Sequence, residues 1–458
     1  MKVIICGAGQ VGTGIAERLS AEGNDVAIID SSEALVQRAN DVLEVRALHG
    51  NAAQPDVLER AGARDADMLI AVTLYDEVNM VACQVANRLF GVPTRIARVR
   101  SQAYLAEQWS GLFAREGMAI DHIISPEIEV GKTVLNRLEL PGAFETATFA
   151  DGLVTAAGIY CGPECPILDT SLLQLSELFP DLPAVTVAIM RGGKLVVPHG
   201  RDRILDGDEA YIIAPTAQIA RTLQIFGHEE AKARRIVIAG GGNIGLYLAE
   251  TLEELQPNVR VKIIEASRQR AVEIAEKLKR SVVLHGSALS EDVLREADIT
   301  SADTLVAVTN DEQVNLLTSA LAKQLGCRSS LCLINSANYS GMIRSLNIDA
   351  TVNPRAVTVS RILQHVRRGR IRGVHAIQNG AGEIIEIEVL EKAGVLQRPL
   401  REIKLGDGVR FGAVLRAGEP LMPTGDLELE VRDRVVVFAS ADSVRDVEAI
   451  FRVSPDYF

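Results

Sequence analysis

The sequence lacks any apolar run that approaches the roughly 18 to 20 residues needed to cross a bilayer. Its N-terminus enters a predicted strand directly after Lys2, so we also expect no signal peptide. The formal net charge is −12, and this acidic balance disfavours a general affinity for nucleic acid or anionic lipid. We therefore expect a soluble, cytoplasmic protein that neither binds nucleic acid nor inserts into a membrane.

A local exception to the acidic balance is the segment HVRRGRIRG at residues 365–373. A solvated helix end, where cations complement the helix dipole, is the first interpretation. Contact with an acidic partner surface is the alternative.

Cysteine is scarce and scattered, which favours buried thiols in a reducing compartment over a disulfide framework. Cys161 and Cys165 are separated by three residues, one more than in a CxxC redox motif, and no second pair completes a zinc site. We therefore expect no metal site, and the spacing disfavours a redox role for this pair. The six cysteines are Cys6, Cys83, Cys161, Cys165, Cys327 and Cys332.

What the chain does contain is a dinucleotide-binding glycine signature that occurs twice. KVIICGAGQVGTGIAERL at residues 2–19 and RIVIAGGGNIGLYLAETL at residues 235–252 each run from an apolar strand through three glycines into a helix. The blocks at 48–62 and 66–79 recur at 284–298 and 302–315, both 236 residues later. Two blocks that share one offset indicate a duplicated βαβ domain.

A second, smaller unit is duplicated as well. The segment at 188–214 matches the segment at 413–439, and alternating stretches separated by glycine turns are typical of β-hairpins. We therefore predict an α/β chain with two Rossmann-like, doubly wound parallel-sheet domains, each followed by a small α+β domain. The predicted boundaries are 1–130, 131–230, 231–365 and 366–458.

Each glycine loop is expected to cradle a pyrophosphate, because glycines allow a tight turn and close backbone approach while the helix N-terminus attracts negative charge. The second strand of each copy then ends in an acid, Asp30 or Glu265. A carboxylate there accepts hydrogen bonds from the ribose hydroxyls and repels a 2′-phosphate, which favours NAD or a plain adenine nucleotide over NADP. The residues of the two cradles are Gly7, Gly9, Gln10, Val11 and Gly12, and Gly240, Gly242, Asn243, Ile244 and Gly245.

Further ligand positions follow from the strand ends. Asn51 and Ser287 follow the ends of the third strands and are candidates to contact the adenine ring. His49 and His285 are expected to be core or turn residues. The next strands end at the sheet edge where ligands bind in open α/β folds. The candidates at that edge are Thr73, Asp76 and Asn79 in the first copy, and Thr309, Asp311 and Asn315 in the second.

The two copies then diverge. RIARVRS at 95–101 offers Arg98 and Arg100 beside the predicted phosphate site, whereas SLCLINS at 330–336 has leucine and asparagine there. Guanidinium groups bind polyphosphate in bidentate fashion and stay charged. We therefore expect the first site to respond more strongly to terminal phosphates. The sequence Gly131-Lys132-Thr133 is not a P-loop, because Pro126 replaces the required glycine, and a helix is expected instead.

Taken together, GAGQVG, GGGNIG, AVTNDEQVN and ARVRS resemble the RCK/KTN regulatory proteins of potassium channels and transporters over the whole chain. The resemblance implies a regulatory subunit, not an enzyme, that assembles as a ring, most simply a homotetramer, on a membrane-embedded potassium-translocating partner. NAD(H) and ATP or ADP would bind the large domains and alter potassium flux. The small domains at 140–227 and 374–453 would link subunits, with the apolar residues Leu172, Leu175, Leu178 and Phe179 either at that interface or in the domain's own core.

Two alternatives stay open at the level of sequence. An NAD-dependent oxidoreductase shares the Rossmann fold, but the small domains are poor in paired His, Lys or Tyr groups for proton transfer; consumption of NADH with a metabolite would support it. A redox-sensing DNA-binding regulator would need a helix-turn-helix and a basic surface, and neither is apparent. Salt-sensitive operator binding would support that alternative.

Overall fold

The computed structural model describes residues 1–114, 117–366, 371–377, 380–391, 393–403 and 405–451. Part of the basic segment singled out above, residues 367–370, lies outside these ranges. Arg372, at its described end, pairs with Glu388 within the second small domain. No helix within the described residues is long and apolar enough to span a membrane.

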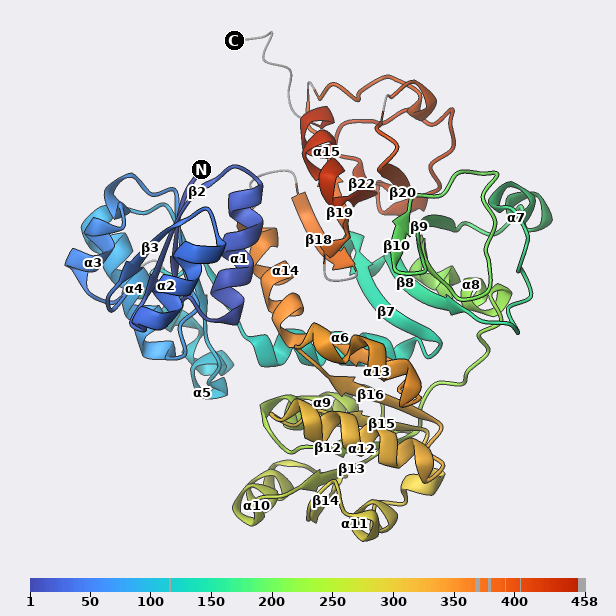
Figure 1. The fold of residues 1–458 in the computed structure, drawn as a ribbon, viewed down its shortest axis with the longest axis horizontal. Coiled ribbons are helices and arrows are strands. Elements are labelled where there is room, and N and C mark those ends of the chain that lie inside the picture. Colours follow the sequence, from blue (N-terminus) through green and yellow to red (C-terminus); the bar gives the residue numbers. More distant parts are fainter. Residues whose placement is uncertain (115–116, 367–370, 378–379, 392, 404, 452–458) are drawn as a thin grey trace. The chain divides into compact units, whose positions relative to one another are not determined.

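The first large domain is built on a six-stranded parallel sheet in the order β3-β2-β1-β4-β5-β6 (Figure 1). The central strand β1 is buried along KVIIC after its first residue, as expected for a strand covered on both faces. The strands are β1 (Lys2–Cys6), β2 (Asp25–Asp30), β3 (Arg46–His49), β4 (Met68–Ala71), β5 (Thr94–Arg98) and β6 (His122–Ile124). The helices are α1 (Gln10–Ala21), α2 (Glu33–Val42), α3 (Pro55–Arg60), α4 (Asp76–Phe90) and α5 (Gln102–Leu105).

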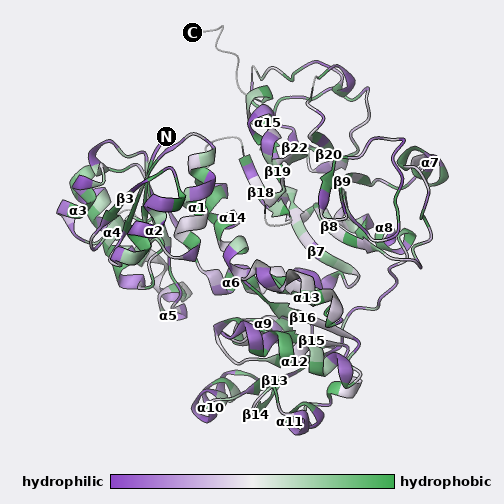
Figure 2. Ribbon diagram, viewed as in Figure 1, coloured by the Kyte–Doolittle hydropathy of each residue, from purple (hydrophilic) through white to green (hydrophobic). Residues whose placement is uncertain are grey.

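The second large domain repeats this topology strand for strand, in the order β14-β13-β12-β15-β16-β17. The prediction of two doubly wound parallel sheets is therefore confirmed. The strands are β12 (Arg235–Ala239), β13 (Arg260–Glu265), β14 (Val282–His285), β15 (Thr304–Ala307), β16 (Ser329–Leu333) and β17 (Ala350–Val352). The helices are α9 (Asn243–Leu255), α10 (Arg268–Lys277), α11 (Glu291–Glu296), α12 (Glu312–Gln324) and α13 (Ser340–Ser345). Figure 2 shows α9 and α12 with hydrophobic and hydrophilic residues interleaved, as expected for helices that cover a sheet.

Each small domain has a five-stranded antiparallel sheet, and the two orders β10-β9-β11-β8-β7 and β21-β20-β22-β19-β18 correspond. The first contains β7 (Ala143–Phe149), β8 (Val154–Cys161), β9 (Val185–Arg191), β10 (Lys194–Val196), β11 (Asp208–Pro215), α7 (Leu172–Leu178) and α8 (Ile219–Ile225). The second contains β18 (Ile371–Ile377), β19 (Gly382–Glu388), β20 (Val409–Arg416), β21 (Glu419–Leu421), β22 (Arg434–Ser440) and α15 (Val444–Ile450).

The two small domains share a core inside this one chain. Phe149, Tyr211 and Ile213 of the first pack in one buried cluster with Ile384 and Phe438 of the second. The apolar residues of the α7 region have a different environment: Leu175 is buried in the first small domain's own core, Leu172 and Phe179 pack against that core, and Leu178 is exposed.

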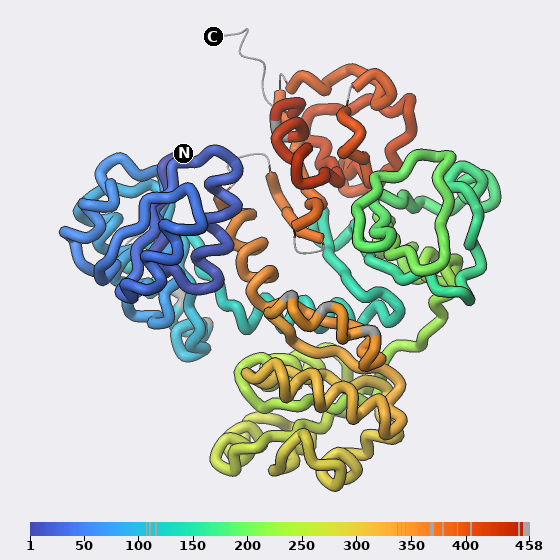
Figure 3. Tube along the Cα trace, in the orientation of Figure 1, coloured from blue at the N-terminus to red at the C-terminus, as the bar shows by residue number. Residues whose placement is uncertain are grey.

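Two helices follow the large domains, α6 (Pro126–Glu139) after β6 and α14 (Pro354–Val366) after β17. The chain divides into two compact units, residues 1–131 with 353–366, and 132–352 with the described residues after 366. The sequence boundaries placed α14 in the second large domain, but Val359, Ile362 and Leu363 of α14 pack in the core cluster beneath α1. In Figure 3 the orange segment of α14 lies against the dark blue segment of α1.

Candidate functional site

The glycine loops at the ends of β1 and β12 have the same backbone geometry. Gly7 and Gly240 have φ angles of +111° and +110°, a region that side chains other than glycine rarely adopt. A Cβ on Gly12 would lie 1.8 Å from the Gly7 carbonyl oxygen, and one on Gly245 would lie 2.0 Å from that of Gly240. Both loops therefore require glycine to bring the helix close to the strand.

Each loop delivers the open N-terminus of a helix. Helices α1 and α9 begin at Gln10 and Asn243. Their N-cap residues are Gly9 and Gly242, so neither helix has a side-chain hydrogen bond from its N-cap residue. These four residues are exposed, whereas Val11 and Ile244 are half-buried. Exposed backbone N–H groups at the positive end of a helix dipole form a site for phosphate oxygens.

The acid at the end of the second strand joins the glycine loop to the next helix. Asp30 accepts hydrogen bonds from the backbone N–H of Ala8 (2.6 Å) and of Ser32 (2.8 Å). Glu265 accepts the equivalent bonds from Gly241 (2.8 Å) and Ser267 (2.7 Å). The two copies thus place a half-buried carboxylate at the tip of the strand in the same way.

The second loop also holds an arginine that the first lacks. Arg270 donates from Nε to the carbonyl oxygen of Gly241 at 2.8 Å and pairs with Glu273. The corresponding residue in the first copy is Leu35, which packs against the core. The backbone of the second loop is therefore held by a guanidinium group, a contact that the sequence comparison missed.

The third strands end in short turns. Asn51 Oδ1 accepts from the Ala53 N–H at 2.9 Å, and Ser287 Oγ accepts from the Leu289 N–H at 3.2 Å. His49 and His285 are exposed, and His49 Nε2 lies 3.1 Å from the Ser31 carbonyl oxygen. The expectation of core or turn histidines is therefore wrong, because both are exposed residues at the ends of β3 and β14, while Asn51 and Ser287 are exposed in the turns that follow.

A buried asparagine ties the fourth strand to the fifth in each copy. Asn79 Oδ1 accepts from the N–H and the hydroxyl of Thr73, both at 2.8 Å, and its Nδ2 donates to the carbonyl oxygens of Arg98 (2.9 Å) and Thr73 (3.2 Å). Asn315 makes the same four bonds with Thr309 and Leu333. Their amide groups position the strand ends around the site.

Asp76 anchors the turn after β5. Its carboxylate accepts from the backbone N–H of Arg100 at 3.0 Å and of Ser101 at 2.8 Å. In the second copy Glu312 does this, accepting from the N–H groups of Asn335 (3.0 Å) and Ser336 (3.3 Å). The sequence analysis selected Asp311 as the counterpart of Asp76, which was wrong by one residue.

Asp311 instead caps α12, accepting hydrogen bonds from the backbone N–H groups of Gln313 (2.8 Å) and Val314 (3.1 Å). The offset of 236 residues that the duplicated blocks share was the signal for Glu312, because it relates residue 76 to residue 312. Glu312, and not Asp311, is therefore the counterpart of Asp76 in the second copy.

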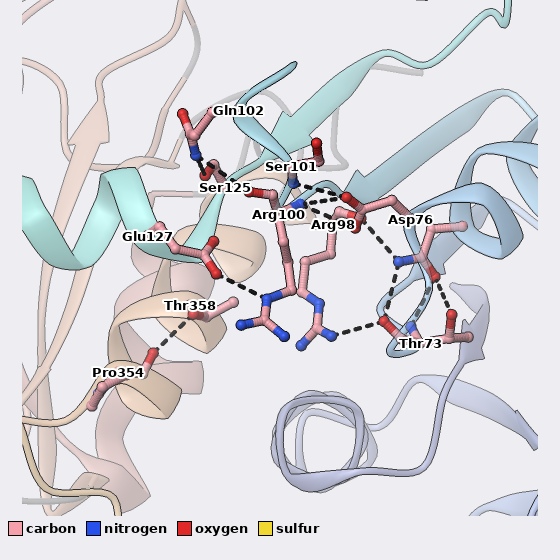
Figure 4. A network of polar contacts seen from close by, with 11 residues as sticks. Thr73, Asp76, Arg98, Arg100, Ser101, Gln102, Ser125, Glu127, Pro354 and Thr358 are labelled. Carbon is pink, nitrogen blue, oxygen red and sulfur yellow. Dashed lines mark hydrogen bonds and ion pairs between the residues drawn. The ribbon is translucent and has the colours of Figure 1, made fainter. Parts of the chain in front are cut away.

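The first site gathers two arginines around a buried glutamate (Figure 4). Arg98 Nη2 donates to the Thr73 carbonyl oxygen at 2.8 Å, and Arg100 Nε donates to Glu127 Oε1 at 2.8 Å. Glu127 is 5% exposed, and among the described residues neither its Oε2 nor Arg98 Nε has a hydrogen-bond partner. Burial, and next the charge of Arg100, lower the pKa of Arg98 against the opposing effect of Glu127 and Asp76.

The sequence analysis did not select Glu127. The local signal for it is Pro126, which precedes Glu127 and begins helix α6. The second site has no guanidinium at the positions of the two arginines: Leu333 is buried in β16, and Asn335 follows it. The expected difference in charge between the copies is therefore present in the structure.

Helix α14 brings residues from the second half of the chain to the first site. Pro354 and Thr358 lie beside Glu127 and Arg100 in Figure 4, and Thr358 donates to the Pro354 carbonyl oxygen at 2.8 Å. Arg355 lies against α1, so that a Cβ on Gly14 would be 3.1 Å from Arg355 Nη2. Sequence reasoning could not find this neighbour, because more than 300 residues separate it from α1 in the chain. Within the described residues no group of three His, Cys, Asp or Glu side chains is arranged to hold a metal ion.

Comparisons with known proteins agree with this duplicated arrangement. A family model described as the TrkA-N domain matches residues 3–126 and again 236–354, and one described as the TrkA-C domain matches 384–452. A Trk system potassium uptake protein TrkA from Azorhizobium caulinodans is 56% identical over 458 residues, covering 100% of both chains. Another from Halomonas elongata is 40% identical over 462 residues, again covering 100% of both.

Solved structures match the fold over almost the whole length. The crystal structure of the GsuK RCK domain has a TM-score of 0.59 at 15% identity, covering 98% of this chain and 94% of that one. The GsuK channel bound to NAD has a TM-score of 0.59 at 15% identity, covering 98% of this chain and 78% of that one. At this level of identity the likeness shows a shared fold.

Proposed function

The chain belongs to the TrkA family of Trk-system potassium-uptake proteins, and from this premise we propose that it is a cytoplasmic subunit that regulates an integral-membrane, potassium-translocating partner similar to TrkH. It acts at the cytoplasmic face of the inner membrane through that partner. The named relatives are potassium-uptake proteins, so the chain is not an enzyme, and the oxidoreductase and DNA-regulator alternatives are set aside.

The observation that carries the proposal is a pair of phosphate cradles with unequal charge around them. Both copies offer an open helix N-terminus and a carboxylate at the ribose position, which suits NAD(H) and adenine nucleotides. Only the first copy adds Arg98 and Arg100. The first site is therefore the one that distinguishes ATP from ADP, and the second binds the shorter or less charged ligand.

These subunits form a ring, and a nucleotide shifts the ring between two conformations only by the difference in its binding free energy for them. A homotetramer gives such a ring, and a coupling of about 1 to 3 kcal/mol is the usual range for allosteric proteins. Two features of the first site suit this role: its ligand would lie beside α14, and α14 precedes the second small domain in the sequence. A ligand that contacts α14 would thereby be linked to the second half of the chain.

The proposal is tested by potassium uptake in cells that lack this gene and depend on one Trk-type partner. Asp30→Ala removes the carboxylate at the ribose position, and Asp25→Ala, at the exposed other end of the same strand, is the matched control. We expect wild type and Asp25→Ala to restore nucleotide-dependent uptake at limiting potassium, and Asp30→Ala to lose that dependence. Uptake that is unchanged by deleting the gene would reject the regulatory role.

Binding to the purified chain tests the ligand assignment separately. Loss of hydrogen bonds to a charged group costs about 1.5 to 3 kcal/mol. Asp30→Ala should therefore weaken NADH by roughly 10-fold to 100-fold and reduce the preference for NADH over NADPH, while Asp25→Ala does neither. Calorimetry that finds equal NADH affinity for both variants would remove Asp30 from the site.

A further inference from the structure

Cys161 and Cys165 are at opposite ends of a turn in the first small domain. Cys161 is the last residue of β8, and the Cys165 N–H donates to the Gly162 carbonyl oxygen at 2.9 Å, which closes the turn. Both side chains lie in the same apolar core cluster, with exposed fractions of 0% for Cys161 and 7% for Cys165. The two thiols are neighbours in space, and the more exposed one is Cys165.

The proximity of the two thiols makes them chemically unequal. The neighbouring Cys161 thiol lowers the pKa of Cys165 against the effect of burial, and the Ile167 backbone and the charge of His228 lower it further. Burial raises the pKa of the other thiols that do not belong to this pair, namely Cys6, Cys83, Cys327 and Cys332. Since the thiolate is the nucleophile, we expect Cys165, the more exposed thiol of the pair, to be the most reactive of the six cysteines.

The repeat shows that the fold does not need thiols at these positions. Val389 and Ala393 occupy them in the second small domain, where the Ala393 N–H closes the same turn on the Leu390 carbonyl oxygen at 3.1 Å. Both are buried, at 0% and 5% exposure. Two small apolar residues therefore fill the turn, and the cysteine pair is an addition specific to the first small domain.

We propose that Cys161 and Cys165 are a dithiol that a hydroperoxide converts into a reversible intramolecular disulfide. The Cys165 thiolate attacks one peroxide oxygen, which breaks the O–O bond, yields a sulfenic acid and releases water or an alcohol. The Cys161 sulfur then attacks the Cys165 sulfur, and the S–OH bond breaks as the S–S bond forms and water leaves. The two thiols lose two electrons together, and the peroxide gains them.

The turn lies against the segment that leads into the second large domain. A Cβ on Gly227 would be 2.9 Å from Pro166 Cδ and 3.6 Å from Cys165 Cα, so α8 ends in close contact with the turn. His228 Nε2 lies 3.0 Å from the Tyr160 carbonyl oxygen, and its Nδ1 lies 3.1 Å from Glu230 Oε1. Drawing Cys165 toward Cys161 changes the surface against which this connecting segment packs, and this change does not require a bound nucleotide.

The test is peroxide treatment of the purified full chain, followed by alkylation with N-ethylmaleimide and a tryptic map. Residues 138–191 contain no lysine or arginine before Arg191, so both cysteines fall in one peptide. We expect that peptide to lose two hydrogen atoms in mass and both alkylation sites, with full reversal by dithiothreitol. The other four cysteines should stay alkylatable once the chain is denatured.

The matched control is the double variant Cys161→Val, Cys165→Ala, which installs the residues of the repeat and should fold with an unchanged circular dichroism spectrum. It should show no oxidation at the peroxide dose that converts wild type. A second measurement uses the native chain at neutral pH, where iodoacetamide should label Cys165 before any other cysteine. A native chain whose peptide 138–191 keeps both thiols after that dose, or in which another cysteine is labelled first, would overturn the proposal.

Discussion

At the residue scale, the duplication separates positions that build the fold from positions that select a ligand. Asn79 and Asn315 make the same four hydrogen bonds in both copies, so this asparagine is needed to hold two strand ends together. The positions of Arg98 and Arg100 hold Leu333 and Asn335 instead, within the same backbone. Residues that differ while their surroundings stay the same are the candidates for ligand choice.

Replacing Asn79 by alanine should destabilise the first unit. The change leaves buried backbone groups of Thr73 and Arg98 without their partner, which costs about 2 to 3 kcal/mol. The thermal unfolding midpoint of the full chain should fall, and Asn315→Ala should lower it by a similar amount. Asn51→Ala, at an exposed turn, is the control and should stay within about 0.5 kcal/mol. A thermal unfolding midpoint of Asn79→Ala equal to that of wild type would show that Asn79 does not hold the two strand ends together.

Replacing Arg98 by leucine and Arg100 by asparagine copies the second site into the first. The double variant should lose roughly 10-fold to 100-fold in ATP affinity, because charge-assisted bonds to the terminal phosphate disappear, and much less in ADP affinity. Calorimetry with both nucleotides measures the ratio. A variant that weakens ATP and ADP equally would show that the two arginines do not recognise the terminal phosphate.

At the scale of elements, the docking of α14 on α1 depends on a small residue at their contact. Gly14 is buried in α1, and a Cβ there would lie 3.1 Å from Arg355 Nη2 and 3.3 Å from Val359 Cγ2. The equivalent residue of α9 is Tyr247, which is half-buried. The two equivalent helices therefore have different partners, although the sheets beneath them have the same topology.

Enlarging Gly14 tests that contact. A glycine inside a helix is usually improved by alanine, by roughly 0.5 to 1 kcal/mol. Gly14→Ala should not show this gain, because the added carbon meets Arg355, and Gly14→Leu should destabilise by about 1 to 3 kcal/mol through overpacking. Urea unfolding of the full chain measures both. Stabilisation by both substitutions would show that α14 does not pack closely here.

At the scale of the whole molecule, reciprocal polar contacts join the two small domains around their shared core. Glu145 of the first small domain accepts a hydrogen bond from Tyr211 Oη (2.9 Å). It shares a second hydrogen bond with His375 Nε2 of the second small domain (2.9 Å). In return, Glu386 of the second accepts from the Ala150 N–H at 2.9 Å. The pairing that the family resemblance assigned to contacts between subunits is thus present within one chain.

The Glu145 contact should make this joint sensitive to acid. Burial alone would raise the pKa of Glu145, but the bond and charge of His375, the charge of Arg137 and the bond from Tyr211 together lower it. A carboxyl with a lowered folded pKa stabilises the folded state above its unfolded pKa, and that contribution is lost as pH falls through the folded pKa.

We expect the urea midpoint of wild type to fall more steeply than that of Glu145→Gln as pH decreases from about 6 to about 3. Glu388→Gln, which removes a carboxylate that pairs within one small domain only, is the control for loss of a charge. Parallel pH profiles for wild type and Glu145→Gln would show that Glu145 titrates as it does in the unfolded chain.

The sequence alone determined the duplication, the glycine cradles, the acids at Asp30 and Glu265, and the unequal arginines, because each depends on local spacing along a strand, turn or helix. Only the tertiary structure decided the partners of Glu127, the position of α14 on α1, the neighbouring thiols of Cys161 and Cys165, and the shared core of the small domains. These depend on packing between segments or on the direction of side chains at a turn. Hydrophobic burial, which drives such packing, has no direction, so the local pattern of apolar residues does not identify which segments pack together.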